Sequence, residues 1–150
     1  HVLQPMTVRK QVDADGTERD VFIAYSLGNF ISSQRTEPRD AGIIVNIEVS
    51  KTEGERAVID KIELVPTWVQ FKNTAGQDFV RVIGVSDAIK DYELGITNEL
   101  RTKDISRLKR VHKETTEIYF EEAVPDEEMK AIYTFYERPS NDERLNDITG

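Results

Sequence analysis

The chain has 150 residues, a formal net charge of −8 and no cysteine. The acidic balance excludes a general nucleic-acid binder, which needs a positive surface, and the lack of cysteine excludes a thiol nucleophile, a zinc ribbon and a disulfide framework. A hydrophobic fraction of 38%, rich in Val and Ile, excludes a disordered chain, and the length corresponds to a single unit with one core.

Two strands are predicted within the first 25 residues. Val2–Arg9 alternates loosely around Pro5, which is typical of an edge strand or of the entry into a strand. After a turn cluster at Asp13–Gly16, the segment Asp20–Tyr25 is almost continuously apolar. This pattern predicts a strand that is buried on both faces.

A hairpin and one further strand complete the predicted sheet. Gly42–Val49 and Ala57–Val65 carry regularly spaced apolar residues, and the polar cluster Lys51–Glu55 separates them. This arrangement predicts an antiparallel hairpin. Phe79–Val85 is one more short apolar segment, preceded by a turn at Asn73–Gln77. Residues 1–85 are therefore predicted to be mainly strands.

The hydrophobic period changes from 2 to about 3.6 after this point. A short helix is predicted to begin with Ser86 or Asp87 as its N-cap and to carry Ile89 and Tyr92. A longer helix is predicted over Lys103–Phe120, because an apolar stripe of the kind that docks on a sheet runs along it. The stripe contains Ile105, Leu108, Val111, Thr115, Ile118 and Tyr119.

A third helix is predicted to begin near Pro125, where a proline suits the first helical turn. Residues with the spacing of one helix face follow at Met129, Ile132, Tyr133 and Tyr136. Pro139 would end this helix, and 140–150 is predicted to be a frayed tail. The predicted strands all precede the predicted helices along the chain. This order predicts an α+β fold, in which the helices of 86–139 cover a strand-rich N-terminal half.

Two segments are candidates for a functional site. Ser26–Phe30 follows a predicted strand, and its Ser, Gly and Asn residues can present polar groups at a strand end, where sheets commonly carry chemistry. The alternative is a plain turn in which Gly28 supplies a positive φ and Asn29 caps the next segment. The second candidate is 1–5, whose lone His1 would need further ligands to hold a metal. His112 is expected on the surface of its helix.

Together these segments resemble the bacterial capsule synthesis family of CapA/PgsA type, the poly-γ-glutamate biosynthesis proteins. In that family a stretch G-x-H-P-H-V-x-Q-P precedes a strand ending Y-S-L-G-N-F. The second histidine of the first stretch falls on His1, with Val2, Gln4 and Pro5 matching after it, and 25–30 matches the second stretch. The resemblance covers roughly the first 50 residues.

The resemblance implies a metallophosphoesterase-like fold, a two-sheet sandwich flanked by helices, with a divalent metal ion held by loops at strand ends. It makes His1 a metal ligand and places Ser26, Gly28, Asn29 and Gln4 along the same cleft. The family's other metal motifs precede this one, so the resemblance implies that the chain is the C-terminal portion of a larger protein. The chain alone is then expected to bind no metal tightly and to be inactive.

For the intact protein, the resemblance implies metal-assisted handling of phosphate esters at the extracytoplasmic face of the cell envelope, with the membrane anchor outside this chain. The expected partners are the N-terminal remainder of the same protein, other capsule synthesis subunits and poly-γ-glutamate, and no nucleic acid. The alternative is a non-catalytic, β-rich accessory module that binds polymer or partner subunits.

The segment 101–113 carries six basic residues and one acid. One hypothesis is that this helix face guides a polyanion or contacts anionic lipid. The alternative is a solvated helix whose charges are offset by acidic residues folded beside it.

Overall fold

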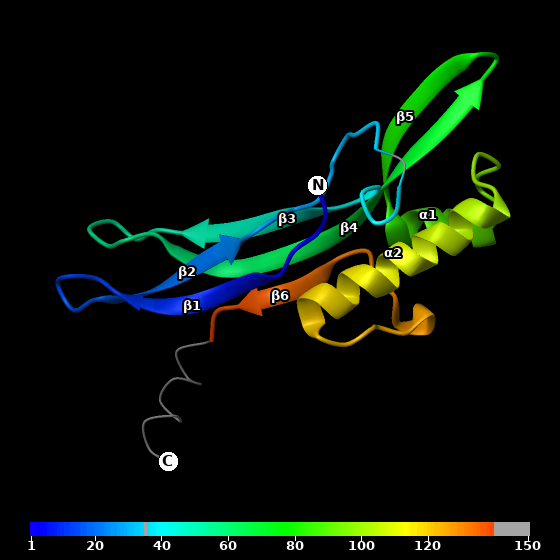
Figure 1. Cartoon of the computed structure of the whole chain (residues 1–150). Helices are drawn as coiled ribbons and strands as arrows, with labels where there is room; N and C mark the ends of the chain where they lie inside the picture. Colours follow the sequence, from blue (N-terminus) through cyan, green and yellow to red (C-terminus); the bar gives the residue numbers. More distant parts are fainter. Residues whose placement is uncertain (35, 140–150) are drawn as a thin grey trace.

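The computed structural model describes residues 1–34 and 36–139, and these form an α+β fold (Figure 1). Strands dominate the N-terminal half and helices follow, which confirms the predicted fold class. In chain order the elements are β1 (Met6–Val12), β2 (Glu18–Ala24), β3 (Ala41–Ser50), β4 (Val58–Thr74), β5 (Gln77–Gly84), α1 (Val85–Glu93), α2 (Thr102–Phe120), the 3₁₀ turn η1 (Asp126–Glu128) and β6 (Tyr133–Glu137).

The long strand β4 organises the larger sheet. One edge of β4 pairs antiparallel with β3, as far as the pair Ala41–Trp68. The other edge pairs with β6 and then, from Thr67 onwards, with β5. The predicted hairpin over Gly42–Val49 and Ala57–Val65 is therefore confirmed. β4 runs nine residues beyond the predicted end at Val65, because it continues from its pairing with β3 into its pairing with β5.

β1 and β2 form a separate two-stranded sheet that packs against the larger one. Phe22 of β2 meets Phe135 of β6 edge to face, with ring centroids 6.3 Å apart. The hydroxyl of Tyr136 donates a hydrogen bond to Asp20 Oδ2 at 2.8 Å. The prediction that β2 is buried on both faces is wrong: Phe22 is half-buried, because only one face of this small sheet has a neighbour to pack against.

Helix α2 lies along the larger sheet and closes the core (Figure 1). Leu108 and Val111 of α2, together with Ile62 and Leu64 of β4, are at most 1% exposed. The predicted helix over Lys103–Phe120 is confirmed, and its stripe faces the core. The predicted N-cap of α1 is wrong, since Gly84 occupies that position and makes no side-chain cap.

The third predicted helix is wrong. Only η1 forms there, and the following residues enter β6, where Tyr133 lies opposite Leu64 of β4. The strand exists because β4 offers an unpaired edge beside the start of β5, and pairing with it places Tyr133 and Phe135 against the core. Ile132, which the helical spacing placed on the buried face, is 47% exposed. The predicted tail, 140–150, lies outside the described residues.

Candidate functional site

The Ser26–Phe30 segment joins the two sheets. On one side Leu27 forms an antiparallel bridge with Leu3, and the backbone N–H of Gln4 donates to Ser26 O at 3.2 Å. On the other side the N–H of Asn29 donates to Ala41 O at 3.1 Å, and the N–H of Ile43 donates to Leu27 O at 3.0 Å. The two segments that carry the family resemblance are therefore hydrogen-bonded to each other.

The bridge keeps the register of the β1–β2 hairpin. Met6 pairs with Ala24, and the bridge joins Leu3 and Leu27, which lie three positions further along each chain segment. Two more positions in the same register would bring the exposed His1 opposite Asn29. The shared cleft of His1 with Ser26, Gly28, Asn29 and Gln4 stays a prediction, to which this register gives a geometric basis.

Two glycines allow the backbones at this junction to approach closely. Gly28 and Gly42 form an antiparallel bridge, and Gly28 has a φ of +71°. A Cβ atom on Gly28 would lie 2.5 Å from the backbone oxygen of Ala41 and 2.9 Å from Leu3. A Cβ on Gly42 would collide with the backbone of Asn29. Both positions therefore require glycine.

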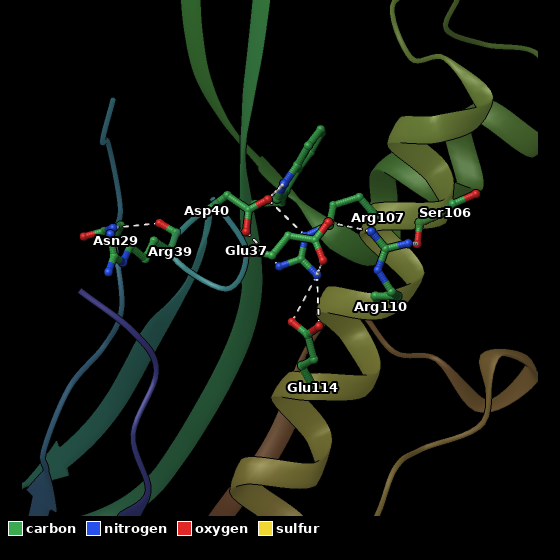
Figure 2. Close-up of polar contacts among 9 residues, drawn as sticks. Asn29, Glu37, Arg39, Asp40, Ser106, Arg107, Arg110 and Glu114 are labelled. Carbon is green, nitrogen blue, oxygen red and sulfur yellow. Dashed lines mark hydrogen bonds and ion pairs between the residues drawn. The ribbon is translucent and has the colours of Figure 1, made fainter. Parts of the chain in front are cut away.

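The polar side chains of the segment hold neighbouring backbone in place. The hydroxyl of Ser26 accepts a hydrogen bond from the N–H of Gly28 at 3.3 Å. The amide nitrogen of Asn29 donates to Arg39 O at 2.7 Å (Figure 2). It also donates to Gln34 Oε1 at 3.1 Å. Asn29 thereby fixes the loop that leads into β3.

The next residue of that loop, Asp40, forms a buried ion pair with helix α2 (Figure 2). Arg107 donates from Nη2 to Asp40 Oδ1 at 2.7 Å and from Nε to Asp40 Oδ2 at 3.0 Å. Trp68 Nε1 donates to the same carboxylate at 2.8 Å. Asp40 and Arg107 are 6% and 5% exposed. Burial works against the charged form of Asp40, but the hydrogen bonds from Arg107 and Trp68 outweigh it, and the pKa of Asp40 lies below its usual range.

The ion pair extends outwards along α2. Arg107 Nη1 donates to both oxygens of Glu114 at 3.1 Å, and Glu37 lies 3.5 Å from the same nitrogen. Glu37 in turn accepts a hydrogen bond from Arg110 at 2.6 Å. These side chains tie the 36–40 loop to one face of the helix, and the two arginines offset two of the three carboxylate charges.

A cleft of about 540 Å³ opens beside this network. Its walls come from the first residues of the chain, the 37–41 loop and α2, and its lining residues are Val2, Leu3, Glu37, Pro38, Ala41, Glu114, Glu117 and Ile118. Glu37 and Glu114 form ion pairs with arginines. Their role is therefore to stabilise the walls of the cleft, and not to act as general acids or bases. Leu3 and Ala41 connect the cleft to the junction of the two sheets.

His112 is buried, so its predicted place on the helix surface is wrong. Its side chain is 1% exposed, and Nε2 lies 2.7 Å from the hydroxyl of Tyr133. That hydroxyl also accepts a hydrogen bond from the N–H of Lys130 at 2.9 Å, and the tautomer of the imidazole sets which of the two side chains donates to the other. Burial lowers the pKa of His112, with the charge of Asp126 opposing. A neutral imidazole is therefore part of the joint between α2 and β6.

Most of the basic side chains of the 101–113 segment have an acidic partner nearby. Arg107 and Arg110 are paired as described above, and Lys109 lies 3.2 Å from Asp126. Arg101 pairs with Asp104, which reaches back to cap the start of the helix. This pairing favours the solvated, charge-compensated helix over a polyanion guide.

Metal ligands do not converge within the described part of the chain: it holds no group of three or more His, Asp or Glu side chains that could hold an ion. Among the same residues, no helix is both long and apolar enough to cross a bilayer.

Sequence reasoning missed the Asp40–Arg107 pair. The available signal was the position of Arg107, which shares a helix face with Asp104, Leu108 and Val111 and so had to be buried with a partner.

No protein-family model matches this chain, and neither a curated protein nor a solved structure is significantly similar to it.

Proposed function

We propose that this chain is part of a bacterial capsule synthesis protein of CapA/PgsA type, in which it contributes His1 to a divalent-metal site. The observation that supports the proposal is the pairing of residues 3–4 with residues 26–27, the two segments on which the resemblance rests. The same register, carried two positions further, would bring His1 opposite Asn29. Neutral imidazole and amide oxygen are both suitable donors for a divalent ion.

The remaining ligands would come from other parts of the intact protein. This chain offers one candidate ligand, the imidazole of His1, whereas a metal centre needs three or more protein ligands. The chemistry that a divalent ion supplies when bound is polarisation of a phosphoryl oxygen and generation of hydroxide. The role of the present residues is positional: Gly28 and Gly42 bring the two sheets together, and Asn29 orders the loop before β3.

The test is the metal content of the intact protein, measured by mass spectrometry after dialysis, together with hydrolysis of a generic phosphodiester. His1→Ala should lower bound metal at least tenfold, since even residues behind the ligands change metal affinity by about 10–100-fold. His112→Gln is the control, because it removes the other imidazole of the chain without touching the proposed site. Unchanged metal content in folded His1→Ala protein would overturn the proposal.

A second candidate is a non-catalytic module that binds a partner subunit, and the exposed apolar side chains around the junction favour it. Tyr25, Leu27, Phe30 and Ile31 are 43–70% exposed within seven residues, and clustered exposed apolar residues mark interaction surfaces. The metal analysis, combined with an assay of polymer production in cells that carry the variant, separates the two. An intact protein that holds no metal and still supports polymer production in the His1→Ala form acts as such a module.

A further inference from the structure

The segment that joins α2 to β6 runs back along the helix (Figure 1). It begins at Glu121, whose φ of 62° ends α2, and we call 121–132 the strap. Every residue of the strap is exposed or half-buried. Val124 and Met129 are only partly buried against the core, so little apolar burial holds the strap in place. Its position therefore depends on its polar contacts.

Two of these contacts lie at the surface of α2. The N–H of Val124 donates to Thr116 Oγ1 at 3.1 Å. In η1, the carboxylate of Asp126 lies 3.2 Å from Lys109 Nζ. Both members of that ion pair are well exposed, and exposed pairs contribute little to stability. The strap is therefore only weakly fastened along most of its length.

The third contact is buried and lies at the end of the strap. The N–H of Lys130 donates to the hydroxyl of Tyr133, which lies 2.7 Å from His112 Nε2. Tyr133 and His112 are 7% and 1% exposed. Among residues 1–34 and 36–139, the other ring nitrogen of His112, Nδ1, is buried and has no hydrogen-bond partner. His112 thus fastens the end of the strap to α2 through Tyr133.

The charged groups around His112 offset a positive ring only in part. η1 contributes Asp126, whose carboxylate pairs with Lys109 of α2, and Lys109 also lies 3.9 Å from Glu93 of α1. β6 contributes Tyr133, whose pKa is raised by burial, so that its hydroxyl stays neutral. Burial lowers the pKa of His112, and the opposing effect of Asp126 is smaller. The face of β4 beneath the helix is apolar, with Ile62 and Leu64.

We propose that His112 is a pH-sensitive latch: when its ring takes up a second proton, the strap and Tyr133 move away from α2 while the rest of the chain stays folded. A second proton makes both ring nitrogens donors. In the closed form that ring would be a buried charge with an unpaired N–H at Nδ1, and such groups are costly. Opening lets water reach the ring and removes this cost.

The rest of the fold has its own supports. The apolar stripe of α2 packs against the larger sheet, and Arg107 ties the helix to the 36–40 loop. Beyond Tyr133, β6 remains paired with β4, and the N–H of Arg138 donates to Asp60 O at 2.8 Å. Local opening is typical of segments with few buried apolar contacts, and the strap is such a segment.

The direction and size of the effect follow from proton linkage. An exposed histidine has a pKa of about 6.5, and the ring in the closed form has a lower one, so the open form binds more protons. The ratio of open to closed strap should therefore rise as the pH falls below about 6.5, by at most about tenfold per pH unit.

The test is hydrogen exchange, measured by NMR on the whole chain between about pH 7.5 and 5. Protection factors correct for the pH dependence of the exchange chemistry. Those of Val124 and Lys130 should fall with pH, by up to about tenfold per unit. Val69, whose N–H donates to Asp40 O at 2.8 Å, is the internal control. Its protection should stay well above that of the strap at every pH.

His112→Gln is the matched variant, and circular dichroism establishes that it is folded. Glutamine can bond to the Tyr133 hydroxyl and does not titrate, so the protection of the strap should not vary with pH. A fall in this variant equal to that in the wild type overturns the proposal, as does constant protection in the wild type. Equal protection of Val124 and Val69 overturns it too, because the strap would then open only when the whole chain unfolds.

A measurement on the wild type alone covers an unfolded His112→Gln variant. The ring signals of His112, followed by NMR against pH, should show a titration midpoint below about 6.5. A midpoint at or above that value would show that the closed form accepts the second proton without cost, and the latch would be excluded.

Discussion

Arg107 on α2 binds both carboxylate oxygens of Asp40, a residue that lies 67 positions earlier in the chain. The pair connects the helix to the loop that Asn29 holds from the other side through Arg39 O. The junction of the two sheets and the helix that covers the core are therefore linked by side chains, beside the cleft at the start of the chain.

Arg107→Ala should lower the free energy of unfolding by about 3–5 kcal/mol, because it leaves the Asp40 carboxylate buried without its cation. Arg110→Ala is the matched control on the same helix. Its pair with Glu37 is half-exposed, and such pairs contribute about 0–1 kcal/mol. Urea denaturation measures both values, and equal small losses in the two variants would contradict a structural role for the buried pair.

Gly42→Ala should destabilise the chain by about 1–3 kcal/mol, the usual effect of forcing extra volume into packed structure. The new Cβ would collide with the backbone of Asn29, which cannot move without breaking the pairing of Asn29 with Ala41. Gly84→Ala is the control, since the nearest atom to its Cβ is 3.8 Å away. Thermal unfolding measures the stability of both variants. A Gly42→Ala protein as stable as Gly84→Ala would show that the backbone at the junction of the two sheets can shift to accommodate the new Cβ.

Much of the fold follows from local patterns. β3 and the first half of β4 alternate, and α2 carries an apolar stripe, so each could be predicted from its own residues. β6 could not, because its apolar residues also match a helix face and only the open edge of β4 decides between the two. Tertiary pairing overrides local propensity at such a segment.

The site was less predictable than the fold. The closeness of the first residues to Ser26–Phe30 came from motif resemblance and not from periodicity. The Asp40–Arg107 pair joins residues far apart in sequence, and no local rule selects one acid among many as the partner of a buried arginine. His112 looked like a surface residue because its neighbours Lys109, Arg110 and Lys113 are charged, although it lies four residues after Leu108 on the buried stripe.

The stability of the chain should fall as the pH drops below about 6.5, the ordinary pKa of histidine. Burial lowers the pKa of His112 in the folded chain, so in this range the unfolded chain binds more protons than the folded one. The loss from this residue is at most about 1.4 kcal/mol per pH unit. Asp40, whose pKa is lowered below its usual range, contributes only at more acidic pH, below about 4.

The free energy of unfolding of the wild type and of His112→Gln is measured by urea denaturation at several pH values. These lie between about pH 7.5 and 5, the range in which histidine side chains usually titrate. Glutamine can accept or donate a hydrogen bond to the Tyr133 hydroxyl and does not titrate, so the variant should show a flatter profile. Parallel profiles for the two proteins would mean that His112 is protonated as readily in the folded chain as in the unfolded one.

Tyr133→Phe tests the joint between α2 and β6 directly. The hydroxyl of Tyr133 accepts a hydrogen bond from the N–H of Lys130 and shares another with His112 Nε2, so its removal leaves two polar groups without partners, one of them fully buried. The expected loss is about 1–3 kcal/mol. Tyr25→Phe is the matched control, because Tyr25 is 64% exposed and surface substitutions usually stay within about 0.5 kcal/mol. A Tyr133→Phe protein with unchanged stability would show that the hydroxyl does not stabilise the joint between α2 and β6.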